Sequence, residues 1–259
     1  MLSPDLLDRR AIALIRLVDP YGRPVDGPVR IEGEGVRTVA KGAGRFALVA
    51  AKGMDEYTAA FEEPPAQAPV ALTLDLTPAE TGVAPRRFVL ALPRDPDPAN
   101  AQSPTSLFQP AEVAMLPSAR IRLTGSACAV RVTVCRKDDG RLVENALVRA
   151  RSDDLPLEAR AVTDHRGEAC LLFPSLPLAF AGPAASVRPD MSAKVVVHAD
   201  PASAHFHEAA DPAASAQATR TVGHADPDAI AAAFPADFTS GAAVQLAAGR
   251  QLSLSILWE

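Results

Sequence analysis

Long apolar runs and basic runs are both missing from this 259-residue sequence. No segment approaches the ~18 uninterrupted apolar residues of a membrane-spanning helix, so we expect no membrane span. The formal charge is −5, and no run of Lys or Arg interrupts the acidic balance, which argues against a nucleic-acid partner. Residues 1–10, MLSPDLLDRR, lack the apolar core and cleavage site of a secretory signal. We therefore expect the protein to be cytoplasmic, or to belong to a particle assembled in the cytoplasm.

Cysteine and aromatic residues are also few. The three cysteines, Cys128, Cys135 and Cys170, include no CxxC pair of the kind that binds zinc or does redox chemistry. We expect them to be small buried apolar residues in a reducing compartment. Proline, in contrast, occurs 24 times, which forbids long helices and long central strands and favours short strands joined by turns.

The two halves of the chain resemble each other. Residues 12–33 and residues 131–152 both read as an alternating apolar run, a turn, and a second alternating run. Within them, the turn Gly22–Gly27 (GRPVDG) aligns with Gly140–Asn145 (GRLVEN). An internal repeat with a period of about 120 residues indicates two copies of one domain.

The repeat continues downstream. Residues 41–48 (KGAGRFAL) align with residues 164–171 (DHRGEACL), after a five-residue difference in spacing. Both segments predict a tight turn that leads into a core strand, because Asp and Gly are turn residues. Further short strands are predicted at 70–76, 87–92, 193–198 and 252–258. Short strands at this spacing predict an all-β fold of antiparallel β-sandwiches.

These motifs resemble the carboxypeptidase regulatory-like domain, a transthyretin-like β-sandwich. The resemblance covers residues 12–49 and 130–173, the first half of each copy. It implies two such sandwich domains in tandem, and it implies no activity, because these domains serve as spacers, adhesive modules and accessory domains. Members of the family beside peptidases are usually secreted, whereas this sequence shows no signal.

The sequence also predicts the domain limits. We expect a first sandwich over residues 1–94, a proline-rich linker over 95–112 and a second sandwich over 113–259. The second is expected to contain a long Ala/Pro/His/Asp-rich insert over about 199–242. Inside the insert, Asp226 and Pro227 predict the N-cap and first residue of a short helix over 230–234.

The insert contains four of the five histidines, and these are the candidate metal ligands. His205 and His207 would face the same side of an extended segment, and imidazole nitrogen suits zinc or a similar divalent ion. His198 and His224 are the further candidates. The competing interpretation is a polar loop with solvated histidines, so the cofactor prediction is none, with a divalent metal as the alternative.

Catalytic motifs give no support to an enzyme. His165 and Glu168 match the His-x-x-Glu dyad of metallocarboxypeptidases, but the repeat places them in a tight turn without a third ligand. Transthyretin-like dioxygenases bind iron through two tyrosines and two histidines. The only tyrosines here are Tyr21 and Tyr57, and Tyr21 is a turn residue far from the histidine cluster, so this chemistry is not expected. There is no GxSxG motif, and the glycine clusters precede no phosphate-binding helix.

Two apolar segments are candidate interaction sites. Leu2, Leu6 and Leu7 form an arm that either packs on its own domain or reaches a neighbouring molecule. The final strand, 252–258, alternates cleanly, with Leu252, Leu254 and Ile256 facing the core and Ser253, Ser255 and Leu257 facing outward. It is interpreted either as a last core strand or as an edge strand that pairs with another chain, with Leu257 and Trp258 at the contact.

We therefore expect a non-enzymatic structural or adaptor subunit of a larger protein assembly, whose partners are other protein subunits or a second copy of the chain. A module of an extracellular type that is made in the cytoplasm is similar in this respect to accessory proteins of phage tails and phage-tail-like contractile injection systems. The alternative is a ligand- or metal-binding module that uses the His/Asp-rich insert.

Overall fold

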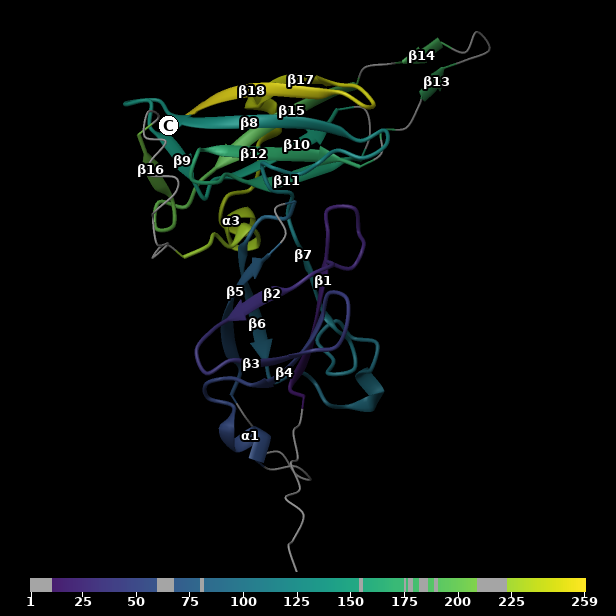
Figure 1. The fold of residues 1–259 in the computed structure, drawn as a ribbon, viewed down its shortest axis with the longest axis vertical. Helices are drawn as coiled ribbons and strands as arrows, with labels where there is room; N and C mark the ends of the chain where they lie inside the picture. The colour runs from purple at the N-terminus through teal and green to yellow at the C-terminus, as the bar shows by residue number, and fades with distance from the viewer. Residues whose placement is uncertain are drawn as a thin grey trace, which may run out of the picture. The chain divides into compact units, whose positions relative to one another are not determined.

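The chain folds into β-sandwiches, as the sequence predicts (Figure 1). The computed structural model describes residues 11–59, 68–79, 82–153, 156–174, 176, 179–181, 186–188, 191–208 and 223–259. These residues divide into two compact units. The first comprises the described residues of 11–18, 22–79 and 88–114. The second comprises the described residues of 19–21, 82–87 and 115–259.

The first unit contains two sheets. One has the order β3 (Arg37–Ala40), β4 (Arg45–Ala50), β1 (Ala13–Val18) and β7 (Ala111–Ala114). The other has the order β2 (Val29–Glu32), β5 (Val70–Pro78) and β6 (Arg86–Leu92), and a short helix α1 (Asp55–Ala59) follows β4. The first two residues of β6, Arg86 and Arg87, belong to the second unit. Both sheets contribute fully buried side chains to the core, among them Ile15, Leu17, Leu48, Leu74, Leu76 and Leu92.

The second unit also contains two main sheets. One has the order β11 (Glu158–Val162), β10 (Leu147–Ser152), β15 (Met191–His198) and β17 (Ala242–Leu246). The other has the order β12 (Glu168–Phe173), β8 (Cys128–Arg136), β9 (Leu142–Glu144) and β16 (His205–His207), with β18 (Gln251–Trp258) paired to β8. A separate hairpin joins β13 (Ala179–Ala181) to β14 (Ser186–Arg188).

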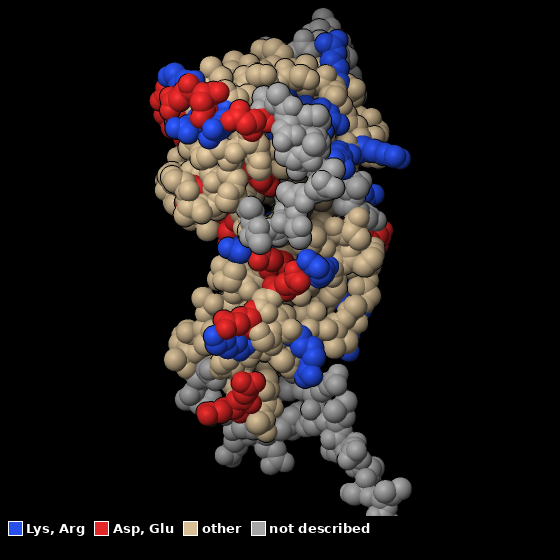
Figure 2. Space-filling model, turned by 60° about the vertical axis from the view of Figure 1, so that its left-hand side comes forward, with Lys and Arg blue, Asp and Glu red and all other residues tan. Residues whose placement is uncertain are grey.

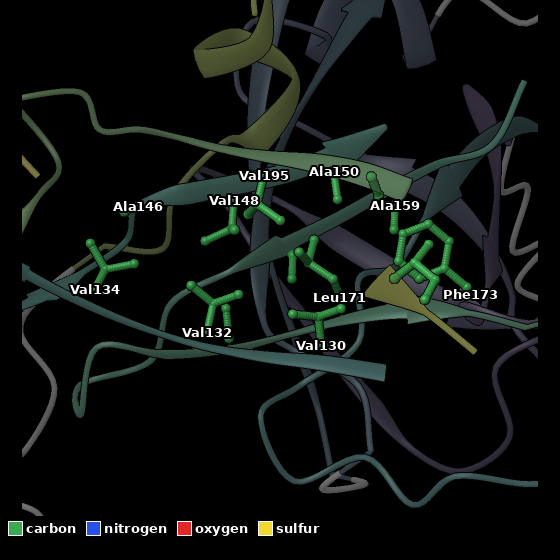
Figure 3. Packing of buried hydrophobic residues seen from close by; sticks show 14 of the residues in the cluster. Val130, Val132, Val134, Ala146, Val148, Ala150, Ala159, Leu171, Phe173 and Val195 are labelled. Atoms are coloured by element: carbon green, nitrogen blue, oxygen red, sulfur yellow. The ribbon is translucent and has the colours of Figure 1, made fainter. Parts of the chain in front are cut away.

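The core of the second unit lies between its two main sheets. Small and branched side chains from both sheets point toward one another there (Figure 3). Val130, Val132 and Val134 come from β8, while Val148 and Val195 come from β10 and β15. Alternate residues of a strand face the same side, so the alternation in the sequence produces this apolar layer directly.

Most strand predictions are confirmed. The segments predicted at 70–76, 87–92, 193–198 and 252–258 form β5, β6, β15 and β18. The predicted helix is α3 (Pro227–Ala233), and the Asp226 carboxylate accepts the N–H groups of Asp228 and Ala229 at 3.0 and 3.2 Å. Cys128 and Cys170 are buried and Cys135 is half-buried, and all three are free thiols.

Each unit contains a parallel strand pair among otherwise antiparallel pairs, as far as the described registers show. β7 runs parallel to β1, and β18 runs parallel to β8. A parallel neighbour cannot follow through a tight hairpin, so the chain must cross over before it returns. Each unit thus closes with a last strand that pairs with its own first strand.

The proline-rich segment 95–112 is not a linker, which corrects the prediction. It belongs to the first unit, and it ends in β7, which pairs with β1. Its turn is held by Arg94, which is only 8% exposed and whose guanidinium donates to the carbonyl oxygens of Ser106 and Gln109 at 3.1 and 3.3 Å. Proline content alone suggested separation between domains, because no local pattern in the sequence indicates that Arg94 is buried.

The repeat is visible in the backbone at matched positions. Gly22 and Gly140 have φ of 76° and 74°, and Gly27 and Asn145 have φ of 87° and 67°. Gly44 and Gly167 have φ of 61° and 63°. The carbonyl of Gly44 accepts the N–H of Leu17 at 2.7 Å, and the carbonyl of Gly167 accepts the N–H of Val134 at 2.8 Å. The two units therefore use the same turns at the positions that the sequence repeat aligns.

On the face that Figure 2 shows, the described acidic and basic side chains are interspersed with one another. This mixture differs from the continuous basic surface that a nucleic-acid partner requires. None of the helices in the described ranges has the length and apolar character needed to cross a membrane.

Helix α3 is held by a charge cluster within the second unit. The Arg86 side chain, 2% exposed, forms ion pairs with Asp228 and, at 3.7 Å, with Asp226. Arg160 binds the other Asp228 oxygen at 3.0 Å. Burial raises the pKa of the Asp228 carboxyl, but Arg86 and Arg160 outweigh burial and hold this pKa below its ordinary value. On the same helix, Ile230 is buried in one apolar cluster with Leu147.

We expect Gly167→Ala to destabilise the second unit more than Gly140→Ala. Both glycines have left-handed φ, which costs a non-glycine residue about 1–2 kcal/mol. A Cβ at Gly167 would lie 2.6 Å from the Val134 carbonyl oxygen, whereas nothing lies within 4 Å of one at Gly140. The overlap adds about 1–3 kcal/mol. Urea unfolding followed by the fluorescence of Trp258, the single tryptophan, measures the difference. Equal costs for the two variants would contradict the role of the close approach.

We expect Asp228→Asn to lower the free energy of unfolding of the second unit by about 1 kcal/mol at pH 7, a modest value because the carboxyl is half exposed. The folded-state pKa of Asp228 lies below the unfolded value, so its contribution is present above about pH 4 and is lost as the pH falls through the folded-state pKa. The difference between wild type and variant should therefore shrink below about pH 4. Exposed Asp26, changed to Asn, is the control. A difference that stays constant down to pH 2 would contradict this assignment.

Candidate interaction surface

Strand β18 lies at an edge of its sheet. It pairs in parallel with β8 over its whole length, from Gln251 opposite Ala129 to Trp258 opposite Arg136 (Figure 1). Among the described strands, β8 is the only one that hydrogen-bonds to β18. The C-terminal segment is thus an edge strand that belongs to its own sandwich, and its pairing with another chain stays a prediction.

The two faces of β18 differ in burial. Leu252, Leu254, Ile256 and Trp258 are half-buried and pack against the core of the second unit, as the alternation predicts. The intervening side chains, Gln251, Ser253, Ser255 and Leu257, are exposed, and Leu257 is 65% exposed.

Within the described ranges, no strand pairs with the side of β18 that faces away from β8. The carbonyl of Arg250 accepts the N–H of Ala129, and the carbonyl of Trp258 accepts the N–H of Lys137, at 3.0 and 2.8 Å. The two-residue period of a strand therefore directs the even-numbered residues of β18 toward β8. The N–H and C=O groups of the odd-numbered residues, 251 to 257, point away from β8 along the free edge.

Charge distinguishes this edge from the others. Among the described edge strands of the four sandwich sheets, only β17 and β18 have no ionisable side chain. Proteins commonly protect sheet edges with charged residues or proline. The other edge strands follow that rule with Arg30 and Glu32 on β2, Arg37 on β3, Arg86 and Arg87 on β6, Glu112 on β7, Glu158 and Arg160 on β11, Glu168 on β12, and His205 and His207 on β16. β18 is the longest edge strand, with eight residues, and is unprotected.

The end of β18 is fixed in place by aromatic and ionic contacts. The ring of Trp258 stacks on Phe206 of β16 with centroids 6.1 Å apart. The guanidinium of Arg136 lies over the ring of Phe206, 5.2 Å from its centroid. Next to it, Lys137 forms an ion pair with Glu259. Phe206 was not among the predicted site residues, although its position between His205 and His207 in an alternating segment is a strand signal. These contacts hold the C-terminal end of β18 beside β8 and β16.

The four histidines predicted as metal ligands do not form a metal-binding site with one another. His207 Nε2 lies 2.7 Å from the buried Glu144 carboxylate, while His198 stacks on Phe234 with centroids 6.1 Å apart. His205 and His224 are half-buried. In the described part of the chain, no three His, Cys, Asp or Glu side chains are close enough to hold a metal ion. The proposed arm, Leu2, Leu6 and Leu7, lies outside the described residues.

The His-x-x-Glu motif lies in a turn, as the repeat predicts. The Asp164 carboxylate accepts the N–H groups of Arg166 and Glu168 at 2.9 and 3.1 Å, and Arg166 forms an ion pair with Glu168 at 2.6 Å. Glu168 is thus part of a turn-stabilising ion pair beside β12.

No model of a known protein family matches the chain, and no curated protein matches it. Among solved structures, the chain is similar to "The Bacillus anthracis TIE protein", with 12% sequence identity and a TM-score of 0.25. The alignment covers 95% of this chain and 33% of the other, so the present chain spans about a third of that chain's length. These comparisons assign the chain to no family.

Asn145, which follows β9, binds two described segments of the histidine-containing insert, one at Ser203 and one at Gly223. It follows β9 with a left-handed φ of 67°, the conformation of Gly27 in the first unit. Its side-chain amide donates to the carbonyl oxygens of Ser203 and Gly223 at 2.9 and 3.2 Å. The alignment of Asn145 with Gly27 is a sequence signal for the backbone conformation, but not for these two hydrogen bonds.

We expect Asn145→Gly to destabilise the second unit by about 1–2 kcal/mol, because it keeps the left-handed conformation and removes two hydrogen bonds from a buried residue. Asn145→Ala should cost about 1 kcal/mol more, since alanine is strained at this φ. Hydrogen–deuterium exchange should accelerate in peptides covering 203–208 and 223–226. Wild-type exchange rates in the glycine variant would show that the two hydrogen bonds do not hold these segments.

Proposed function

We propose that this protein is a non-enzymatic structural or adaptor subunit of a larger protein assembly, and that it docks through the free edge of β18. The observation that carries the proposal is the edge itself. Its eight residues carry no charge and end in an aromatic contact, and along its outer side the main-chain N–H and C=O groups have no partner strand among the residues that the structure describes. Another strand can satisfy those groups by extending the sheet, which is a common mode of protein recognition.

The exposed side chains of this edge favour a protein partner over a small ligand. Ser253 and Ser255 are short, so another backbone can approach β18 closely. Leu257 adds an apolar contact beside the Trp258–Phe206 pair. This set offers main-chain hydrogen bonds and apolar area, and residues 251–257 include no charged or imidazole side chain.

We also infer that the two units are copies of one transthyretin-like domain of the carboxypeptidase regulatory-like type. The shared left-handed turns and the matched hydrogen bonds at Gly44 and Gly167 support this inference. So does the parallel closing strand in each unit. A duplicated sandwich is suited to act as a spacer between partners, and fold alone assigns no activity.

The assembly that we propose as its setting is a phage-tail-like contractile particle or a phage tail. Such particles are built in the cytoplasm from many protein subunits, which agrees with the expected place of synthesis. This part of the proposal rests on analogy at the level of the fold.

Affinity purification of the tagged full-length chain from its native cells, at near-physiological salt, tests the proposal. We expect other proteins to be recovered at fixed stoichiometry, with sheath, tube or baseplate proteins identifying a contractile particle. Ser253→Lys together with Ser255→Lys should reduce that recovery at least tenfold, because two lysines protect the free edge. Ala40→Lys, on the exposed edge strand β3, is the matched control. Full recovery of partners by the double-lysine variant would refute docking through β18, and a chain recovered without any stoichiometric protein would refute the assembly role.

A further inference from the structure

We propose that the strand that pairs with the free edge of β18 is β18 of a second copy of this chain, in antiparallel orientation about a twofold axis at Leu254. The inference rests on the proposed function only in using β18 as the docking edge. It adds the identity of the partner and the register of the contact.

The main-chain geometry permits this pairing without disturbing β8. In an antiparallel pair, hydrogen-bonded positions alternate with non-hydrogen-bonded ones. With the axis at Leu254, Gln251 faces Leu257 of the partner and Ser253 faces Ser255 of the partner. These are the odd-numbered residues, whose N–H and C=O groups point away from β8. The four residues on each strand would exchange about eight main-chain hydrogen bonds.

The side chains match in the same register. On the core-facing side, Leu254 faces its own copy, and Leu252 faces Ile256 of the partner. All three are half-buried and already pack against the core of their own unit. Pairing would cover their remaining exposed area with apolar side chains, and apolar cross-strand pairs stabilise sheets. On the opposite side, the small Ser253 and Ser255 face each other.

Charge selects a second copy among the possible partners. A twofold contact brings identical strands together, so any charged residue near the axis meets a charge of the same sign, which destabilises the pair. β18 has no such residue, whereas β3, β6, β7 and β12 each contain one or more residues of a single charge sign. A charged edge of another protein, conversely, would find no complementary charge on β18. Neutral β17 offers a shorter edge of five residues, so β18 makes the larger contact.

The consequence is a sheet that continues through the dimer. The order β12, β8, β18 in one copy would be followed by β18, β8 and β12 of the other. Such a contact is isologous, because the same surface is used by both copies, and it closes at two chains.

Sedimentation velocity of the purified full-length chain between about 1 and 200 µM tests the inference. We expect a reversible dimer. Ser255→Pro should raise the dimer dissociation constant at least tenfold, because proline removes an N–H that points along the free edge and leaves the β18–β8 ladder intact. Ser255→Lys should have a similar effect by placing like charges near the axis, and it keeps the test valid if the proline variant is misfolded. Ala40→Lys should leave the dimer unchanged, and thermal unfolding should show that each variant is folded.

A wild-type chain that stays monomeric up to 200 µM would overturn the inference, and so would a dimer whose dissociation constant is unchanged in folded Ser255→Lys. Neither result alone removes the proposed function. A monomer that is recovered with a different protein, and that loses this protein in the double-lysine variant, would retain docking through β18 and replace the second copy with that partner.

Discussion

The pairing of β18 with the full length of β8 is the interaction on which the second unit depends. β8 is the central strand of its sheet, with β12 along one side and β18 along the other. Its valines form the middle of the core, and the half-buried side chains of β18 pack against the same core. Without β18, the side of β8 that now bonds to it would lose its main-chain partners, and unpaired main-chain groups are costly when buried. The same strand that satisfies β8 has its own outer side left unpaired, so a requirement of folding produces the surface available for docking.

The local structure was largely predictable because strand alternation and turn chemistry are short-range properties. The alternation of valines in residues 130–134 gave the inner face of β8, and the Asp226–Pro227 pair gave the start of α3. The alignment of Asn145 with Gly27 anticipated an uncommon left-handed residue. Alternation also separated the inner leucines of β18 from its outer serines. Each of these inferences needs only a few neighbouring residues.

Long-range pairing was less accessible. Residues 95–112 are rich in proline and polar side chains, and nothing local reveals that Arg94 is buried and collects carbonyl groups from the segment. The pairing of β7 with β1 depends on residues almost a hundred positions apart, which an alternating pattern cannot specify. The contacts of the histidines were also not predictable from neighbouring residues. Their spacing suggested shared ligation, but the partners that they contact, Glu144 and Phe234, are set by the fold.

The parallel closing strand also has a consequence for synthesis. The first unit is complete once Ala114 has been made, so it can fold while the ribosome is still translating the second. The second unit receives the neighbour of its central strand from Gln251–Trp258, which are synthesised long after β8, Cys128–Arg136. Until then, the unfilled side of β8 remains open to strands from other nascent chains. Translation rate, polysome spacing and chaperone access during the interval between the synthesis of β8 and that of β18 should therefore influence the yield of the second unit more than that of the first.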